Sequence, residues 1–200
     1  PMLDRNWASL RAQVHTAANL YEDHFGQRPR GMWLGECGYV PGSDELLREA
    51  AIRYFLVDSH AILLADHRPV YGIHAPVYCP SGVAAFGRDT ESSQQVWSAK
   101  EGYPGDPQYR DFYRDIGFDL PMEYIGPHVH PEGIRMYTGI KYHAITHGKL
   151  HDKWVYDPDA ARARAGLHAS HFRGNREKQV GALAAHMDRP PIVVSPYDAE

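Results

Sequence analysis

Apolar residues recur with a helical period over residues 4–25. They stand three or four positions apart, as on one face of an α-helix: Trp7, Leu10, Val14, Ala18, Tyr21 and Phe25. Asp4 is placed to cap the start of this helix and Gly26 its end. The pattern therefore predicts an amphipathic helix whose apolar face covers a core.

Two short apolar runs and a second helical pattern follow. The run 32–37 predicts a short buried strand, and the run 54–57 predicts another that ends at Asp58. Between them, residues 43–53 predict a helix that begins at Ser43, a favourable N-cap residue. The order helix, strand, helix, strand indicates βα units with a parallel sheet, and hence an α/β fold.

Residues 61–135 have a different character, because Gly, Pro and Tyr are frequent and no period is clear. We expect only short strands there, at 70–73, 83–86 and 133–138. So long a segment without regular structure is unusual in a compact domain and is usually functional. We therefore interpret 61–135 as a large, loop-rich, substrate-binding insertion over the C-terminal rim of the sheet.

Regular patterns return near the end of the chain. Residues 159–168 predict a helix, Asn175 is placed to cap another that runs to Met187, and 192–195 predict a strand. The chain stops directly after that strand and begins without Met. Only about four βα units are evident, whereas a closed parallel barrel takes ~250 residues. We therefore expect residues 1–200 to be an internal fragment of one larger catalytic domain.

The composition narrows the classes of function. Apolar residues make up 43% and charged residues 23% of the 200, as in ordinary globular domains. The net charge of −4 offers no basic surplus for nucleic acid. No apolar run approaches the ~20 residues of a membrane span, no leader peptide is visible, and two cysteines suit a reducing compartment. We expect a cytoplasmic protein. Its 13 Tyr and 4 Trp suit sugar rings, which have apolar faces.

Two carboxylates occupy equivalent places in the predicted sheet. Glu36 lies at the end of strand 32–37, and Asp198 follows strand 192–195 by three positions. Catalytic groups of parallel α/β barrels lie at this end of the strands. Glycoside hydrolysis requires two carboxylates that flank the scissile bond. The alternatives are a structural ion pair at Glu36 and a helix N-cap at Asp198, and Asp58 competes for either role.

Other chemistries find less support in the sequence. His128 and His130 could share one face of a strand, and three further histidines are spaced by four: His143, His147 and His151. No His-Glu-x-x-His pattern accompanies them, so we expect no metal site. Neither a Gly-x-Ser-x-Gly turn nor a phosphate-binding glycine loop occurs, and we expect no cofactor. His60 and His74 are candidates for positions near a sugar site.

Two motifs carry a resemblance to a known family. Residues 33–39, Trp-Leu-Gly-Glu-Cys-Gly-Tyr, resemble the nucleophile motif of glycoside hydrolase family 57, and are most similar to the Trp-Leu-Pro-Glu-Cys-Ala-Tyr of its 1,4-α-glucan branching enzymes. Residues 195–200, Ser-Pro-Tyr-Asp-Ala-Glu, resemble the acid motif of the family. The resemblance implies that Glu36 is the nucleophile and Asp198 the proton donor. Gly35 and Gly38 depart from the motif.

Three further segments, 86–89, 96–98 and 102–106, resemble the part of the branching enzymes that binds glucan. The resemblance implies that Arg88, Gly105 and Trp97 bind substrate. It also implies an incomplete (β/α)7 barrel and a retaining reaction that cleaves α-1,4 links of amylose or glycogen and forms α-1,6 branches. Tyr71 and Tyr78 are candidates for a mobile-loop tyrosine that some members use.

Four alternatives to branching stay open. The same scaffold would support an α-amylase or a 4-α-glucanotransferase, which differ in the acceptor of the glucosyl unit. A metal-dependent, deacetylase-like hydrolase on a related barrel would need a clustered His/Asp triad. A glucan-binding module without catalysis would show sugar affinity and no turnover. The sequence does not indicate an oligomeric state.

Overall fold

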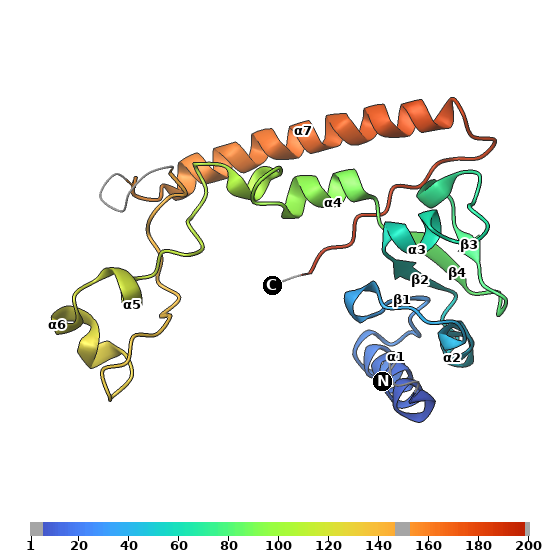
Figure 1. The fold of residues 1–200 in the computed structure, drawn as a ribbon, viewed down its shortest axis with the longest axis horizontal. Helices are drawn as coiled ribbons and strands as arrows, with labels where there is room; N and C mark the ends of the chain where they lie inside the picture. The colour runs from blue at the N-terminus through green and yellow to red at the C-terminus, as the bar shows by residue number, and fades with distance from the viewer. Residues whose placement is uncertain (1–5, 147–152, 199–200) are drawn as a thin grey trace. The chain divides into compact units, whose positions relative to one another are not determined.

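The computed structural model describes residues 6–146 and 153–198, and the chain divides into two units (Figure 1). The first unit comprises Pro1–Ser93 together with Arg176–Glu200, and the second comprises Gln94–Asn175. The boundaries fall within two helices, α4 (Thr90–Trp97) and α7 (Pro158–Ala184).

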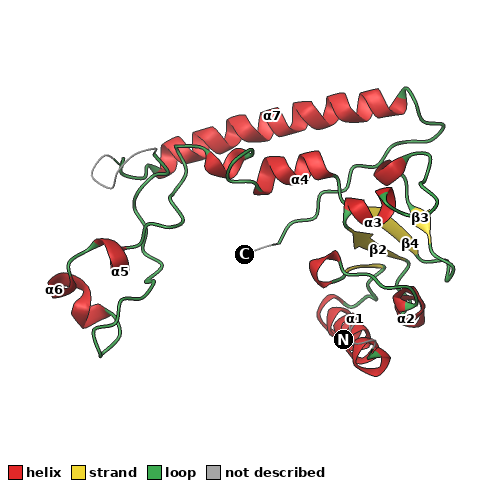
Figure 2. Cartoon of the chain, in the orientation of Figure 1, coloured by secondary structure: helices red, strands yellow, loops and turns green. Residues whose placement is uncertain are grey.

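The first unit contains a four-stranded sheet in the order β1-β2-β4-β3 (Figure 1), whose strands are drawn in yellow in Figure 2. Strands β1 (Gly31–Trp33), β2 (Tyr54–Val57) and β4 (Ala84–Gly87) are parallel, and β3 (Val77–Tyr78) joins β4 in antiparallel orientation. The predicted mixed α/β structure with parallel pairing is therefore confirmed.

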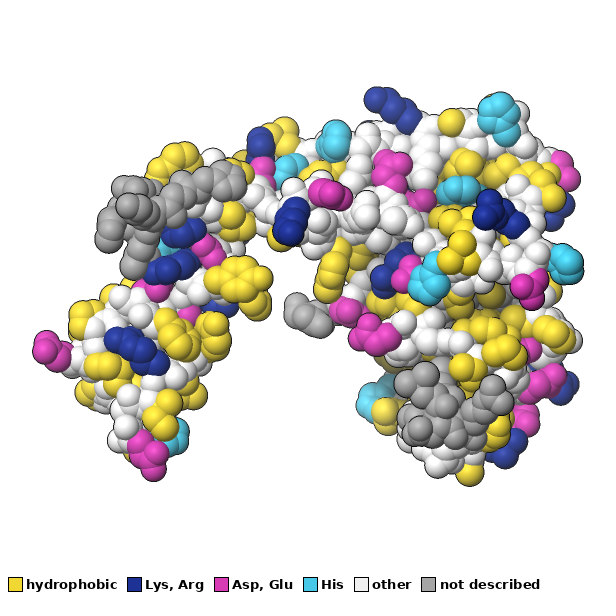
Figure 3. All heavy atoms as spheres, in the orientation of Figure 1, with side chains coloured by type: hydrophobic (Ala, Val, Ile, Leu, Met, Phe, Trp, Pro, Cys, Tyr) yellow, Lys and Arg dark blue, Asp and Glu magenta, His cyan; other side chains and the backbone are white. Residues whose placement is uncertain are grey.

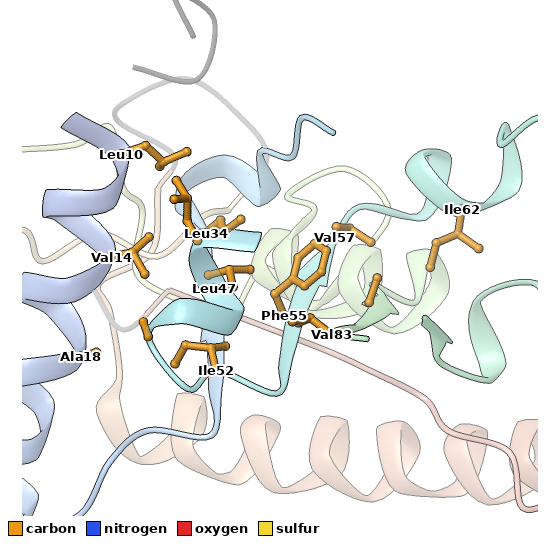
Figure 4. Packing of buried hydrophobic residues seen from close by; sticks show 13 residues of the cluster. Leu10, Val14, Ala18, Leu34, Leu47, Ile52, Phe55, Val57, Ile62 and Val83 are labelled. Carbon is orange, nitrogen blue, oxygen red and sulfur yellow. The ribbon is translucent and has the colours of Figure 1, made fainter. Parts of the chain in front are cut away.

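Helices α1 (Trp7–Phe25), α2 (Ser43–Glu49) and α3 (Ser59–Leu63) complete the core of this unit. Leu10, Val14 and Ala18 of α1 pack with Leu47 of α2 and Phe55 of β2, as Figure 4 shows. These side chains are at most 4% exposed. The middle of the apolar face predicted for the first helix therefore covers the core, whereas its outer members Trp7, Tyr21 and Phe25 are exposed.

The ends of α1 and α2 differ in detail from the predictions. Asn6 caps α1, because its side chain accepts a hydrogen bond from Ser9 N at 3.1 Å, whereas the predicted cap Asp4 lies outside the described residues. Gly26 ends α1 in a left-handed conformation, as predicted. Helix α2 ends four residues early, because Ala51 has a φ of +62° and cannot continue it. Gly42, and not Ser43, is its N-cap.

Several short elements also differ. The strand predicted over 32–37 ends at Trp33 and continues as a 3-10 turn, η1 (Gly35–Cys37). The segment 70–73 is not a strand but leads into the 3-10 turn η2 (Gly72–His74). The strand predicted at 83–86 is confirmed as β4.

The second unit holds short helices and loops besides its parts of α4 and α7. These elements are η3 (Tyr103–Gly105), α5 (Ile116–Asp119), α6 (Met122–Ile125) and η4 (Gly126–His128). The strand predicted over 133–138 is absent. The buried Asp115 instead orders this region by accepting hydrogen bonds from Gly117 N, Thr138 N and Oγ1, and Gly139 N at 2.8–3.0 Å. Hydrophobic side chains reach the surface around α5 and α6 (Figure 3).

The predicted limits of the insertion and of the last helices need correction. Strands β3 and β4 lie inside 61–135 and belong to the sheet, so the segment outside the first unit is 94–175. One continuous helix, α7, replaces the two helices predicted over 159–187, and Asn175 lies in its interior. The seven-membered barrel and the insertion over its rim stay predictions.

Candidate active site

The carboxyl ends of β1, β2 and β4 lie at one edge of the sheet, because these strands are parallel. The C-terminal segment reaches the same edge. Val194 forms a parallel bridge with Arg88, directly after β4, and Asp89 N donates to Val194 O at 2.8 Å. Residues 192–195 thus join the sheet through one bridge and not as the predicted full strand. Glu36, Asp58 and Asp198 all follow backbone segments that end at this edge.

Glu36 lies in a strained turn. Its φ and ψ are 52° and 29°, and Cys37 has a φ of 55°. Left-handed backbone costs about 1–2 kcal/mol for an ordinary residue, and such strain gathers at functional sites. Cys37 N donates to Leu34 O at 3.0 Å, and the buried Cys37 Sγ accepts from Trp33 Nε1 at 3.0 Å. These contacts hold the backbone while Glu36 is exposed.

The side chain of Glu36 makes no hydrogen bond or ion pair with the residues that the structure describes. A structural ion pair, the alternative explanation for a glutamate at a strand end, is therefore not formed among them. Cys37 is buried whereas Glu36 is exposed, as expected for neighbours that point in different directions. The turn presents one carboxylate to solvent at the edge of the sheet.

Asp198 is also exposed, and the residues before it are anchored. The hydroxyls of Ser195 and Ser92 form a hydrogen bond, and Tyr197 OH donates to Ser92 O at 3.0 Å. Within residues 6–146 and 153–198, the carboxylate of Asp198 itself contacts no hydrogen-bonding partner. The alternative of a helix cap concerns Ala199 and Glu200, which lie outside the described residues.

Asp58 has a structural task that the other two carboxylates lack. Its Oδ1 accepts from Ser59 N at 2.9 Å and caps α3, and its Oδ2 lies 3.8 Å from His60 Nδ1. Capping accounts for an aspartate at this strand end. The geometry therefore favours Glu36 and Asp198 over Asp58 as the reacting pair.

Arg88 brings a cation to the same edge. Its guanidinium carbon lies 5.5 Å from the centre of the Trp33 ring, a cation–π contact, and its backbone N donates to Val57 O at 2.8 Å. Its Nε is buried without a hydrogen-bond partner among the described residues. A buried donor without a partner is costly, and the same burial keeps a ligand oxygen from reaching this atom in the present arrangement. The substrate contact predicted for Arg88 stays a prediction.

Asp89 is a site residue that the sequence interpretation missed. It is 3% exposed and accepts from Ser92 N at 2.8 Å, Arg176 Nη1 at 3.1 Å and Gln179 Nε2 at 2.8 Å. Burial alone would raise the pKa of Asp89, but these hydrogen bonds and the charge of Arg176 together lower it. The signal was present in the sequence, because an aspartate directly before Thr90-Glu91-Ser92 is a typical helix N-cap.

Trp97 and Gly105, the other predicted substrate contacts, belong to the second unit. Trp97 ends α4 and is 59% exposed. A Cβ at Gly105 would lie 2.0 Å from Ala99 O, so packing alone requires glycine there. The substrate contacts of both residues stay predictions.

The second unit contains a cavity of about 420 Å³. Side chains with rings make up most of its lining, among them Tyr103, Tyr109 and Phe172. Tyr109 OH lies 2.8 Å from His168 Nδ1, and His168 Nε2 lies 3.4 Å from Asp106 Oδ2. These pairs satisfy the polar atoms of the cavity wall, which leaves mainly apolar ring surface toward the cavity.

The histidines of the metal hypothesis do not form a cluster in the part of the chain that is described. There, no three His, Cys, Asp or Glu side chains come together in a way that could hold a metal ion. His147 and His151 lie outside the described residues. Likewise, no described helix is both long and apolar enough to cross a membrane.

Comparison with known proteins places the chain in a family. The model of the family described as Glycosyl hydrolase family 57 matches residues 1–160, four fifths of the chain. The chain belongs to glycosyl hydrolase family 57. The family resemblance carried by the two carboxylate motifs is thereby confirmed, although the match ends before Asp198.

Three named relatives of the family 57 chain differ in their described activities. The 1,4-alpha-glucan branching enzyme TK1436 of Thermococcus kodakarensis is 32% identical over 231 residues, which cover 100% of this chain and 31% of the relative. The crystal structure of the alpha-amylase AmyC from Thermotoga maritima has a TM-score of 0.83 and 49% identity, covering 96% of this chain and 37% of that one. A branching enzyme from Pyrococcus horikoshii has a TM-score of 0.74 and 32% identity, covering 94% and 34%. The chain thus spans about a third of each.

Proposed function

We propose that the protein cleaves α-1,4-glucosidic bonds as a retaining enzyme, with Glu36 as nucleophile and Asp198 as proton donor. The observation that carries the proposal is the shared edge of the sheet. Two exposed carboxylates follow segments that end there, each held by its own backbone contacts, while the third candidate, Asp58, caps a helix. Family 57 membership supports glycosidic chemistry at this edge.

The chemistry proceeds in two balanced steps. Glu36 attacks the anomeric carbon and forms a glucosyl-enzyme ester while Asp198 gives its proton to the leaving oxygen. In the second step, Asp198 takes a proton from the acceptor hydroxyl, whose oxygen displaces Glu36 with net retention. We further propose that the guanidinium of Arg88, which lies over the Trp33 ring beside the nucleophile turn, donates a hydrogen bond to a sugar oxygen.

For the acceptor, we propose a 6-hydroxyl of α-glucan, so that the product is an α-1,6 branch. The relative from Thermococcus kodakarensis, which aligns over the whole chain, is described as a branching enzyme and supports this choice. Water is the second candidate, because the Thermotoga maritima protein, described as an α-amylase, is 49% identical. The two candidates share the first step and differ only in what enters the second.

One assay separates these outcomes. The protein is incubated with amylose, and α-1,6 links are counted by proton NMR while reducing ends are titrated. New branches support the lead, reducing ends without branches support hydrolysis, and rearranged linear chains indicate a 4-α-glucanotransferase. Affinity for amylose without any turnover would overturn the enzymatic proposal.

Variants test the roles of the carboxylates. Asp198→Asn should lower turnover by about 100-fold or more, the usual contribution of a general acid, and Glu36→Gln should abolish it. Asp58→Asn is the matched control, since asparagine also caps helices and should keep near-normal activity. If Asp58→Asn loses as much activity as Asp198→Asn, the assignment of the pair is wrong.

A further inference from the structure

The segment that carries Asp198 is anchored mainly at one residue of α4. Ser195 Oγ forms a hydrogen bond with Ser92 Oγ, and Tyr197 OH donates to Ser92 O at 3.0 Å. Both contacts come from residues within three positions of Asp198, and they converge on a serine that is 0% exposed. The third link is the backbone bond from Asp89 N to Val194 O at 2.8 Å.

Ser92 is itself held in place by Asp89. Its backbone N donates to Asp89 Oδ1 at 2.8 Å and its Oγ to Asp89 O at 3.3 Å. The carboxylate of Asp89 also accepts from Arg176 and Gln179, both in α7. A continuous set of hydrogen bonds, all within the first unit, therefore runs from α7 through Asp89 and Ser92 to the acid segment.

We propose that Ser92 is a positioning residue that sets the direction of the Asp198 carboxyl. The inference rests on the proposed role of Asp198 as proton donor. Because the Asp198 carboxylate meets no hydrogen-bonding partner within the described ranges, its direction follows from the path of residues 195–197, and Ser92 holds the side chains of two of these residues. A general acid acts only within hydrogen-bond reach of its target, and a displacement of about 1 Å can cost about 100-fold in rate.

The test uses two substrates that differ in their need for an acid. Cleavage of maltoheptaose requires protonation of a sugar oxygen, whereas α-maltosyl fluoride releases fluoride without it. Both reactions are measured over the first turnover, because later turnovers need Asp198 as the base of the second step. Misdirection of Asp198 should therefore slow first-turnover cleavage of maltoheptaose and spare first-turnover release of fluoride. A general loss of folded protein or of the nucleophile would slow both equally, so the ratio of the two rates reports the acid alone.

Three variants and a control complete the design. Ser92→Ala and Tyr197→Phe should each lower kcat/KM for maltoheptaose by about 10- to 100-fold, with the fall in kcat and not in KM. They should change the first-turnover rate of fluoride release by less than about threefold. Asp198→Ala should show the same split, more strongly. Ser93→Ala is the matched control, because Ser93 Oγ is buried on the same turn and has no hydrogen-bond partner among the described residues.

The outcomes are distinguishable. If Asp198→Ala shows no split between the substrates, the proposed function of Asp198 fails. If Asp198→Ala shows the split but neither Ser92→Ala nor Tyr197→Phe does, the proposed function stands and the positioning role of Ser92 is overturned. If Ser92→Ala does not fold, Tyr197→Phe alone tests the positioning role, since it removes only the hydroxyl that donates to Ser92 O.

Discussion

The carboxylate of Asp89 joins the sheet edge to two helices, and its removal is the sharpest test of the architecture. In Asp89→Ala, Ser92 N loses its cap, Gln179 loses an acceptor, and Arg176 retains its ion pair with Glu91 at 2.6 Å. Because Asp89 is 3% exposed, water has little access to replace these bonds while the fold stays closed.

The magnitude follows from these contacts. Loss of an N-cap costs about 1 kcal/mol, and loss of hydrogen bonds to a buried charged group adds about 1.5–3 kcal/mol. Since Arg176 keeps a second partner, the full penalty of an unpaired buried charge does not apply. We therefore expect Asp89→Ala to lower the free energy of unfolding of the first unit by about 3 kcal/mol.

Hydrogen exchange followed by mass spectrometry measures this loss of stability within the first unit. The amides of Ala84 and Arg88 bond to Arg53 O and Val57 O and exchange only when β4 leaves β2. A loss of about 3 kcal/mol corresponds to exchange more than about 100-fold faster. Asp66→Ala, which removes an exposed carboxylate, is the control and should change it by less than about threefold. If the exchange of these two amides in Asp89→Ala also changes by less than about threefold, the reasoning is refuted.

Three further predictions concern backbone strain, pH and packing. Ala51→Gly should raise the free energy of unfolding by about 1 kcal/mol, because Ala51 has a φ of +62° after α2. An unchanged free energy of unfolding would show that the backbone at Ala51 is not strained. Burial alone would raise the pKa of Asp115, but hydrogen bonds from Thr138, Gly117 and Gly139 lower it. Its contribution to stability should therefore be complete above the unfolded value of about 3.9 and be lost as pH falls below it, so a pH titration of the unfolding free energy should be shallower in Asp115→Ala. Gly105→Ala should destabilise the second unit by about 1–3 kcal/mol, because its Cβ would meet Ala99 O at 2.0 Å; exchange of amides near Gly105 measures this.

The local patterns correctly predicted two kinds of element: long segments with a helical apolar period, and short runs of aromatic and β-branched residues. Helix α1 and strand β2 are examples, and the buried Leu10 and Phe55 show why burial reproduces the pattern. The strand predicted over 32–37 failed at Glu36, because a residue with φ of 52° cannot extend a strand and apolar neighbours do not reveal such strain. Motif resemblance found Glu36 there, although periodicity misplaced it.

Near the end of the chain, the local pattern predicted a helix boundary that the structure does not have. Gly174-Asn175 is local turn chemistry and predicts a helix boundary, yet α7 runs through it. The ion pair of Arg176 with Asp89 and the hydrogen bond of Gln179 to the same carboxylate fix the next turn of that helix, and they join residues 87 and 90 positions apart. Long-range contacts of this kind override local propensity and are invisible to a local pattern. The same distance in sequence hid the contacts of Ser92 with the acid segment.

The two proposed catalytic carboxylates depend on different parts of the first unit. Glu36 is placed by its own turn, through left-handed backbone and the bond from Trp33 Nε1 to Cys37 Sγ. Asp198 follows a single sheet bridge and takes its support from α4. Since the pair reacts only at a fixed separation of about 5–5.5 Å in a retaining enzyme, a change in α4 alters that separation by moving the acid alone. Substitutions around Ser92 should therefore impair proton donation and leave the nucleophile intact.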